Sequence, residues 1–123
     1  MIHGKVDAHR EARVHLDVIG PDHRTRTIQA VVDTGFNGYL TLPEDRIEDL
    51  GLHSAGRRRA TLGDGSTITL EGYYAMVLWH DGTRDMTILC SETEPLVGMA
   101  MLDGSRLTMD VIDDGDVCVE KLS

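Results

Sequence analysis

Long hydrophobic runs and aromatic side chains are scarce in this sequence of 123 residues. No run approaches the roughly 18 consecutive apolar residues that a membrane-spanning helix needs. The first residues include an acid and lack the apolar stretch of a signal peptide, so we expect no membrane partner and a cytoplasmic location. Aromatic residues make up only 4% of the chain, which predicts a core built mainly from aliphatic side chains and methionine.

Positive charge is also in short supply. Lys and Arg together number 12 against 21 Asp and Glu, which gives a net charge of −9. Non-specific binding to nucleic acid needs clustered cations that displace counterions, so we expect no nucleic-acid partner. Cysteine occurs only twice, and the spacing of Cys90 and Cys118 fits no metal or redox motif. We therefore expect two buried free thiols rather than a disulfide.

Metal and cofactor motifs are missing as well. No two of the six histidines stand at a ligand spacing with an acid or a cysteine placed to match. The acidic run from Asp113 to Asp116 lacks the alternating ligands and the final Glu of a calcium loop, which favours a simple hairpin turn. The sequence contains no glycine-rich phosphate loop. We expect neither a metal nor a cofactor.

The turn-forming residues along the chain indicate a β protein. Hydrophobic residues make up 41%, charge is spread along the whole length, and no linker interrupts residues 1–123, so we expect one domain. The dipeptide Asp-Gly, which suits tight turns because both residues tolerate positive φ, separates short apolar runs and predicts hairpins. It occurs at Asp64-Gly65, Asp81-Gly82, Asp103-Gly104 and Asp114-Gly115.

Alternating apolar residues predict the strands themselves. Ala12, Val14, Leu16 and Val18 alternate with polar residues, as in a half-buried strand. A similar pattern ends in two adjacent valines, which indicates burial on both faces. Further strands are expected over residues 28–32, 67–70, 73–79, 83–89, 107–112 and 117–122.

Two short helices are expected between the strands. Pro43 suits a first helical position, acidic residues follow it, and Gly51 is placed as a C-cap. Ile47 and Leu50 share one face of this helix. The second candidate, Met99–Leu102, stands just before an Asp-Gly pair.

The chemically most informative segment follows the strand that ends at Val32. This apolar strand leads directly into Asp33, Thr34 and Gly35. A carboxylate at the end of a buried strand loses hydration unless donors hold its charge, and the N–H groups of a tight turn can do so. The tripeptide alone is equally typical of a simple turn in which the Asp caps local N–H groups.

Two later features give the tripeptide a context. A hairpin with a glycine-rich tip follows it, and then two apolar residues and a glycine, Leu96-Val97-Gly98, precede a short helix. In this order the sequence resembles the retropepsin-like aspartic proteases of clan AA, and most of all their short predicted bacterial and archaeal members. The resemblance covers roughly residues 28–110. It implies an all-β fold, a closed or nearly closed β-barrel with one or two short helices, and aspartic endopeptidase activity.

The resemblance also implies roles for single residues. Asp33 would be the catalytic aspartate, and Thr34 would hydrogen-bond to its counterpart in a second subunit. Gly35 would keep the floor of the site open to substrate, and the segment Leu96–Gly98 would cross behind this loop and support it.

The glycine-rich hairpin would be a flap. The resemblance implies that Gly63, Asp64 and Gly65 form its tip and close over a bound peptide. Family members usually have Ala or Ser after Asp-Thr-Gly, whereas Phe36 and Asn37 follow it here. We expect these two residues to contact substrate and the Phe36 ring to narrow the substrate groove.

One Asp-Thr-Gly is half of an aspartic protease site. Such a site uses two carboxyl groups that share one proton, because two adjacent negative charges are costly. With a single copy in the chain, we expect a homodimer in which Asp33 of each protomer lies on the two-fold axis. The partners would be a second copy and a peptide or protein substrate. Two alternatives stay open: a non-catalytic dimeric peptide-binding module on the same fold, and a structural β-domain whose Asp-Thr-Gly is only a turn.

Overall fold

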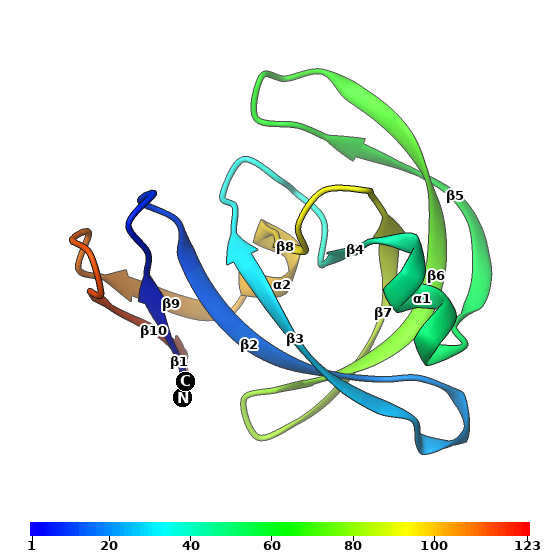
Figure 1. Cartoon of the computed structure of the whole chain (residues 1–123), viewed down its shortest axis with the longest axis horizontal. Helices are drawn as coiled ribbons and strands as arrows, with labels where there is room; N and C mark the ends of the chain where they lie inside the picture. The colour runs from blue at the N-terminus through cyan, green and yellow to red at the C-terminus, as the bar shows by residue number, and fades with distance from the viewer.

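The computed structural model describes all residues from 1 to 123 and is predominantly β, with 55% strand and 11% helix. The all-β class predicted from the sequence is therefore confirmed. The chain forms ten strands and two short α-helices, with a single turn of 3₁₀ helix between β2 and β3. Figure 1 shows how the strands and the α-helices are arranged. The strands are β1 Ile2–Val6, β2 Ala12–Ile19, β3 Thr25–Val32, β4 Thr41–Leu42, β5 His53–Thr61, β6 Thr67–Trp79, β7 Gly82–Cys90, β8 Leu96–Val97, β9 Ser105–Met109 and β10 Asp116–Lys121. The helices are η1 Pro21–His23, α1 Glu44–Leu50 and α2 Met99–Leu102.

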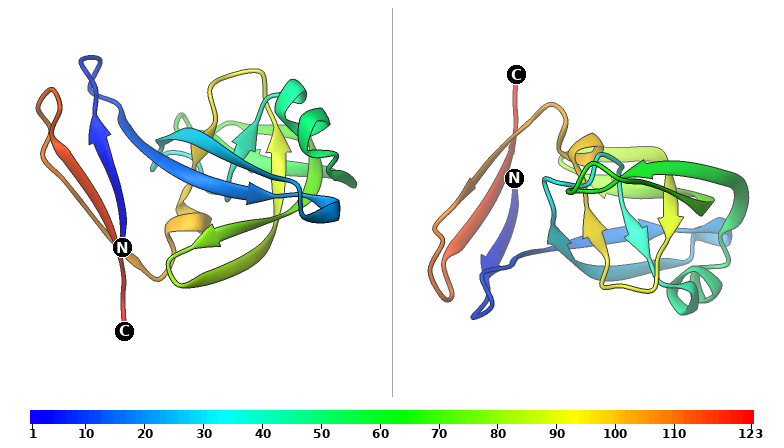
Figure 2. Two further views of the ribbon diagram at one scale, coloured as in Figure 1. Left: turned by 60° about the horizontal axis from the view of Figure 1, so that its bottom comes forward. Right: turned by 90° about the horizontal axis from the view of Figure 1, so that it is seen from above.

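All ten strands belong to one sheet. The main path runs β4-β7-β6-β2-β1-β10-β9, β3 pairs with β2, β5 pairs with β6, and β8 pairs with β3 in parallel. Strands β2 to β8 curve around a central core, while β1, β9 and β10 stand to one side and contain both chain ends (Figures 1 and 2). A closed barrel is not found. Between the segments around β8 and β4 there is one isolated bridge, Leu40 to Val97. Hydrogen bonds join the Leu96 N–H to Thr41 Oγ1 at 2.9 Å and the Gly98 N–H to the Tyr39 carbonyl at 3.0 Å.

The core is aliphatic, as the shortage of aromatic residues predicts. Its main cluster holds 22 buried residues, of which Trp79 is the only aromatic one. On β2, the alternating residues Ala12, Val14, Leu16 and Val18 all point inward and are buried. Burying aliphatic surface of this kind is the main driving force for folding.

Three of the four Asp-Gly pairs join neighbouring antiparallel strands. Asp64-Gly65 turns β5 into β6, Asp81-Gly82 turns β6 into β7, and Asp114-Gly115 lies between β9 and β10. The prediction was wrong for Asp103-Gly104, which connects α2 to β9. At this pair Gly104 has a φ of 80°, so the pair supplies a left-handed turn at the end of a helix instead of a hairpin.

The predicted strand boundaries differ from the observed ones in two places. One continuous strand, β6, replaces the two expected strands, and Gly72 lies inside it. A Cβ on Gly72 would lie 3.0 Å from the Gly56 carbonyl oxygen, so this glycine allows close packing against β5 rather than ending a strand. The strand expected over residues 107–112 ends at Met109, because Ile112 lies in the turn that follows.

Helix α1 forms where the sequence predicts it. Its buried face is formed by Ile47 and Leu50, and Gly51 ends it in the left-handed region with a φ of 65°. Pro43 is the N-cap rather than the first helical residue. The expected helix at Met99–Leu102 is present as α2.

Both cysteines are free, and both are only half-buried rather than buried. Burial, followed by the nearby carboxylates of Glu92, Glu44 and Glu71, raises the pKa of the Cys90 thiol.

No helix of the structure has the length and apolar character required to cross a bilayer.

Candidate functional site

Asp33 stands at the end of β3 and is fixed there through its backbone. Its N–H donates a hydrogen bond to the Val97 carbonyl at 2.8 Å. Its side-chain Oδ1 accepts a hydrogen bond of 2.9 Å from the Gly35 N–H. Asp33 is half-buried, and Thr34 and Gly35 are exposed. The turn therefore holds one oxygen of the carboxylate and leaves the loop accessible.

The segment around β8 crosses directly behind this loop. Val31 pairs with Leu96, and Val32 pairs with Val97, in a short parallel ladder. The contact continues past the strand, where the Gly98 N–H donates to the carbonyl of Tyr39 at 3.0 Å. The crossing that the sequence suggested is thus present, and it provides the loop with backbone partners from a distant part of the chain.

Gly98 is the point of closest approach in this crossing. A Cβ at this position would lie 2.3 Å from the Gly38 carbonyl oxygen and 2.5 Å from a ring carbon of Phe36. The next N–H, that of Met99, donates to the Phe36 carbonyl at 2.8 Å and begins α2. No side chain larger than hydrogen fits between the loop and the helix.

Phe36 has a different place from the one expected. Its side chain is only 2% exposed and forms a small buried cluster with Ala60 and Leu89. The ring therefore fills the space beneath the loop and does not line an open groove. The partners come from β5 and β7, which are distant in the sequence. The one local sign of this packing is Gly38, where a Cβ would lie 2.5 Å from the ring.

Asn37 joins the loop to the last residue of β5, beside the tip of the β5–β6 hairpin. It is exposed, and its Oδ1 accepts a hydrogen bond of 3.2 Å from the Thr61 N–H. Asn37 thus has a structural partner in the same chain as well as an exposed position beside Gly35.

The tip of this hairpin touches the Asp33 loop. A Cβ on Gly35 would lie 3.0 Å from Cα of Gly63, so the two glycines allow the two backbones to approach. Gly65 has a φ of 84°, as the tight turn requires. Hydrogen bonds from the Ser66 side chain and N–H lower the pKa of the Asp64 carboxyl. Of the residues expected at the tip, Gly63 is the one that the structure brings against the loop.

Thr34 faces a small hollow beside α2. A cavity of about 310 Å³ is lined by Thr34, Met99, Leu102 and Leu107, among others, and Met99 is 48% exposed. No hydrogen bond to another residue of the chain uses the Thr34 hydroxyl. An exposed hydroxyl therefore lies next to exposed apolar surface at the edge of the site.

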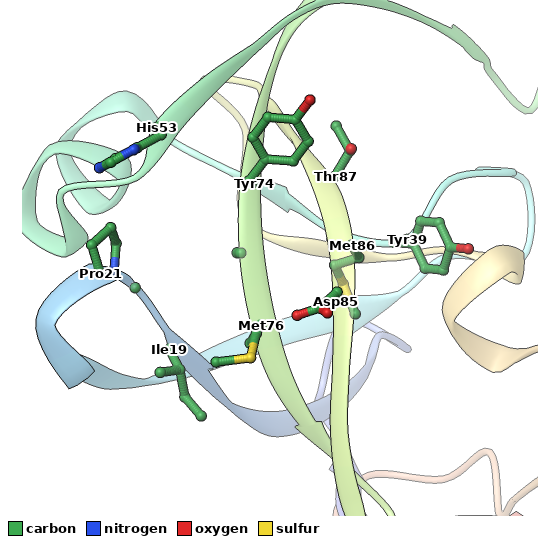
Figure 3. Close-up of a pocket in the computed structure, with 11 residues that line it drawn as sticks. Ile19, Pro21, Tyr39, His53, Tyr74, Met76, Asp85, Met86 and Thr87 are labelled. Atoms are coloured by element: carbon green, nitrogen blue, oxygen red, sulfur yellow. The ribbon is translucent and has the colours of Figure 1, made fainter.

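The larger hollows of the molecule lie away from Asp33. A cavity of about 800 Å³ opens beside β6 and β7, where Tyr74, Met76 and Thr87 are among its lining residues (Figure 3). None of the residues expected to bind substrate lines it. No three histidine, cysteine or acidic side chains come together as metal ligands.

The arrangement offers one oriented carboxylate, a supporting layer behind it and a glycine-tipped hairpin in front. Comparisons of this chain with protein-family models, curated proteins and solved structures gave no match.

Proposed function

We propose that this protein is a retropepsin-like aspartic endopeptidase that acts as a homodimer, with Asp33 of both protomers forming the catalytic pair. The observation that carries the proposal is the joint placement of three segments. The carboxylate accepts a hydrogen bond from the Gly35 N–H, β8 pairs in parallel behind it, and Gly63 at the hairpin tip lies against Gly35. A simple surface turn requires neither the parallel support nor the hairpin contact.

The two Asp33 carboxyl groups have different roles in peptide-bond hydrolysis. One Asp33 is ionised and accepts a proton from a water molecule as the water oxygen bonds to the scissile carbonyl carbon. The other Asp33 is protonated and donates a hydrogen bond to the carbonyl oxygen, which stabilises the charge that develops there. The C–N bond then breaks as the amide nitrogen receives a proton, which leaves one proton shared by the pair.

A second protomer is needed because this chain supplies only one such carboxylate. Thr34 and the exposed side chain of Met99 lie at the edge of the site, where a second copy has to approach. Two protomers together have a net charge of −18, twice the −9 of one chain, and their repulsion is screened beyond about 8–10 Å at ordinary salt. We expect dimerisation to weaken at low ionic strength.

Substrate access requires the hairpin to move. With Gly63 against Gly35, the tip stands over part of the exposed loop, so an extended peptide that crosses Gly35 to reach Asp33 has to displace the tip. The tip is exposed. Its hydrogen bonds lie within its own turn, such as the one from the Ser66 N–H to Asp64 Oδ1 at 2.8 Å. Lifting the tip therefore breaks few contacts.

The experiment is cleavage of a diverse peptide library between pH 4 and pH 8 by the native protein and by Asp33→Asn. We expect cleavage by the native protein that is faster in mildly acidic buffer, and a loss of about 1000-fold or more in the variant, as for other groups that act as a catalytic unit. Asp22→Asn makes the same charge change in η1, at the other end of β3, and should leave cleavage unchanged.

Three results would count against the proposal. Equal cleavage by the native protein and Asp33→Asn would show that the activity belongs to another group. A protein that stays monomeric at all concentrations in equilibrium sedimentation has no complete pair. A rate that climbs steadily above pH 8 would contradict the shared-proton mechanism.

A dimeric peptide-binding module is the second candidate. Strand β5 pairs only with β6, so its other edge is free to accept an extended peptide as an added strand. This candidate predicts peptide binding of equal strength by the native protein and Asp33→Asn, with no cleavage by either.

A further inference from the structure

The outward side of β6 carries large apolar side chains that the rest of the chain does not cover. Every second residue of the strand turns away from the core, and in this series Tyr74, Met76 and Leu78 are 57%, 37% and 43% exposed. The residues between them, Ala75 and Val77, are buried in the main core cluster. Three successive outward positions therefore form an exposed apolar stripe. None of them is assigned to the proposed protease site, and the argument below does not depend on that proposal.

The pairing of the strands shows which side chains flank this stripe. On β2, Asp17 stands opposite Leu78 and Ile19 opposite Met76, and on β7, Asp85 stands opposite Met76. Side chains directly opposite each other in an antiparallel pair lie on the same side of the sheet, about 5 Å apart. Figure 3 shows Met76 between Ile19 and Asp85. We call this surface the β6 face; it consists of Asp17, Ile19, Tyr74, Met76, Leu78 and Asp85.

The β6 face is hollowed. Four of its residues, Ile19, Tyr74, Met76 and Asp85, line the cavity of about 800 Å³ described above. This volume is in the range of pockets that bury a ligand. Contiguous exposed apolar surface is uncommon on soluble proteins and marks interaction sites. A hollowed apolar surface of this kind indicates a binding partner.

The charges of the β6 face favour a cationic partner. Neither Asp17 nor Asp85 takes part in an ion pair, although Asp17 Oδ1 accepts a hydrogen bond of 2.6 Å from the Thr27 hydroxyl. No Lys or Arg lines the cavity, and none stands opposite the three apolar β6 residues on a neighbouring strand. The stripe thus has one carboxylate on each side and no cation to offset them. A second copy would add two more carboxylates, and an anionic membrane surface would be repelled.

The hydrogen bonding of β6 limits how a partner can attach. Met76 and Leu78 are paired with β2 on one side and with β7 on the other, so an added strand has no free edge there. Binding has to use side chains. The stripe from Tyr74 to Leu78 is about 13 Å long. Apolar residues at positions i, i+4 and i+7 of a helix extend over about 10–11 Å, which matches this length.

We propose that the β6 face binds a basic amphipathic helix of a partner protein. The apolar side chains of this helix enter the hollow and pack on the β6 stripe, while its Lys or Arg side chains pair with Asp17 and Asp85. The apolar contacts supply most of the affinity, and the two ion pairs select a basic helix over an acidic one.

The probe is a synthetic peptide of about 18 residues, long enough to form a helix. It consists of leucine and lysine, with leucine at positions i, i+3, i+4 and i+7 so that one side is apolar. One matched peptide has glutamate in place of lysine, and another has serine in place of leucine. Binding is followed through the Met76 methyl signal in ¹H–¹³C spectra, identified by its loss in Met76→Leu. We expect a saturable shift with the leucine-lysine peptide and none with the other two, while the signal of Met99, 48% exposed on α2, stays unchanged.

Two variants of the β6 face have matched controls between β9 and β10. Asp85→Asn should weaken binding by about threefold or more, the range of an exposed ion pair. Asp113→Asn makes the same charge change at an exposed residue outside the β6 face and should leave affinity within error. Leu78→Gln removes apolar contact and should weaken binding by about tenfold. Ile112→Gln, at a side chain that is 68% exposed, should have no effect. All four side chains are exposed at least in part, so the variants should keep the fold.

A Met76 signal that does not move with the leucine-lysine peptide, or that moves equally with either matched peptide, would overturn the proposal. Equal effects of each variant and its control would show general attraction between charges or apolar groups and would reject the site. A shift of the Met76 signal on concentrating the protein alone would assign the face to a second copy. A shift on adding phosphatidylcholine vesicles would assign it to a membrane surface, and either result would replace the helix proposed here.

Discussion

The Asp33 loop and the hairpin tip that touches it are held in different ways. The loop is fixed from outside itself, by β8, by Gly98 and by the buried ring of Phe36. The tip is fixed by its own turn, and Gly63 is its contact with the loop. Local stability follows the density of buried contacts. A supported carboxylate beneath a weakly held cover is the combination that a gated site needs.

The variant with the largest expected loss of stability replaces Phe36, whose ring lies beneath the loop. Phe36→Ala leaves a cavity where a side chain only 2% exposed packs on Ala60 and Leu89, and we expect a loss of about 3–5 kcal/mol in the free energy of unfolding. Urea denaturation measures it. Ile68→Ala is the control on the hairpin, where the side chain is 37% exposed and should cost about 1 kcal/mol or less. Equal losses would show that the loop is no better supported than the hairpin.

Two glycines give the next comparison. Gly98→Ala forces a methyl group to within 2.3 Å of the Gly38 carbonyl oxygen, and we expect a loss of about 3 kcal/mol because backbone has to shift. Gly65→Ala meets no atom within 4 Å, and its cost of about 1 kcal/mol comes from the φ of 84° alone. Thermal unfolding of both variants tests the order, and a larger loss in Gly65→Ala would reverse the comparison.

The connection between the two regions can be removed separately. Asn37→Ala deletes the acceptor for the Thr61 N–H, and because the bond is exposed we expect a loss of about 1 kcal/mol or less. Amide exchange should become faster at Thr61 and leave the Asp33 amide unchanged, since the latter bonds to Val97. Faster exchange at both amides would mean that the hairpin supports the loop.

The smallest expected effect is a loss of stability at low pH. It concerns an ion-pair cluster that includes a residue just before β8, the strand that supports the Asp33 loop. Arg13 bonds to Asp7 at 2.7 Å and to Glu94, which precedes β8, at 2.9 Å. The hydrogen bond from Arg13, with smaller contributions from backbone N–H groups, lowers the pKa of Asp7 to about 2. The ionised Asp7 carboxylate therefore stabilises the folded protein fully at pH values above its unfolded-state pKa of about 3.9. This stabilisation is lost as the pH falls toward 2.

Asp7→Asn should therefore lower the melting temperature at pH 6, and the difference from the native protein should shrink as the pH falls from about 4 to 2. Thermal unfolding followed by circular dichroism at several pH values measures both. A difference that grows toward pH 2 would have the wrong sign for a carboxyl whose pKa is lowered on folding.

The sequence predicts local features well where chain neighbours decide them. Helix α1 follows from its acidic first turn and Gly51, and the β2 alternation follows from its inward face. Strand β1 and most of β5 were not predicted, because both are largely polar and depend on a neighbouring strand for their hydrogen bonds. Only the end of β5 was expected, as the first arm of the glycine-tipped hairpin. The end of β9 was misplaced because Val111 and Ile112 are apolar yet exposed in a turn.

In the candidate site, too, features that depend on sequence order were predicted and features that depend on distant segments were not. The positions of Asp33, of the Leu96–Gly98 crossing and of the hairpin tip agree with the order of motifs in the sequence. The burial of Phe36 could not be foreseen, because Ala60 and Leu89 reach it only after the chain has folded.

The parallel pairing of β3 with β8 also sets an order of events during synthesis. Residues 31–32 leave the ribosome long before residues 96–97, so the Asp33 N–H has no partner until Val97 has been made. Contacts between such distant segments form late, because the intervening loop has to close first. The nascent chain therefore carries an unassembled site until residues 96–97 have been made and have paired with β3.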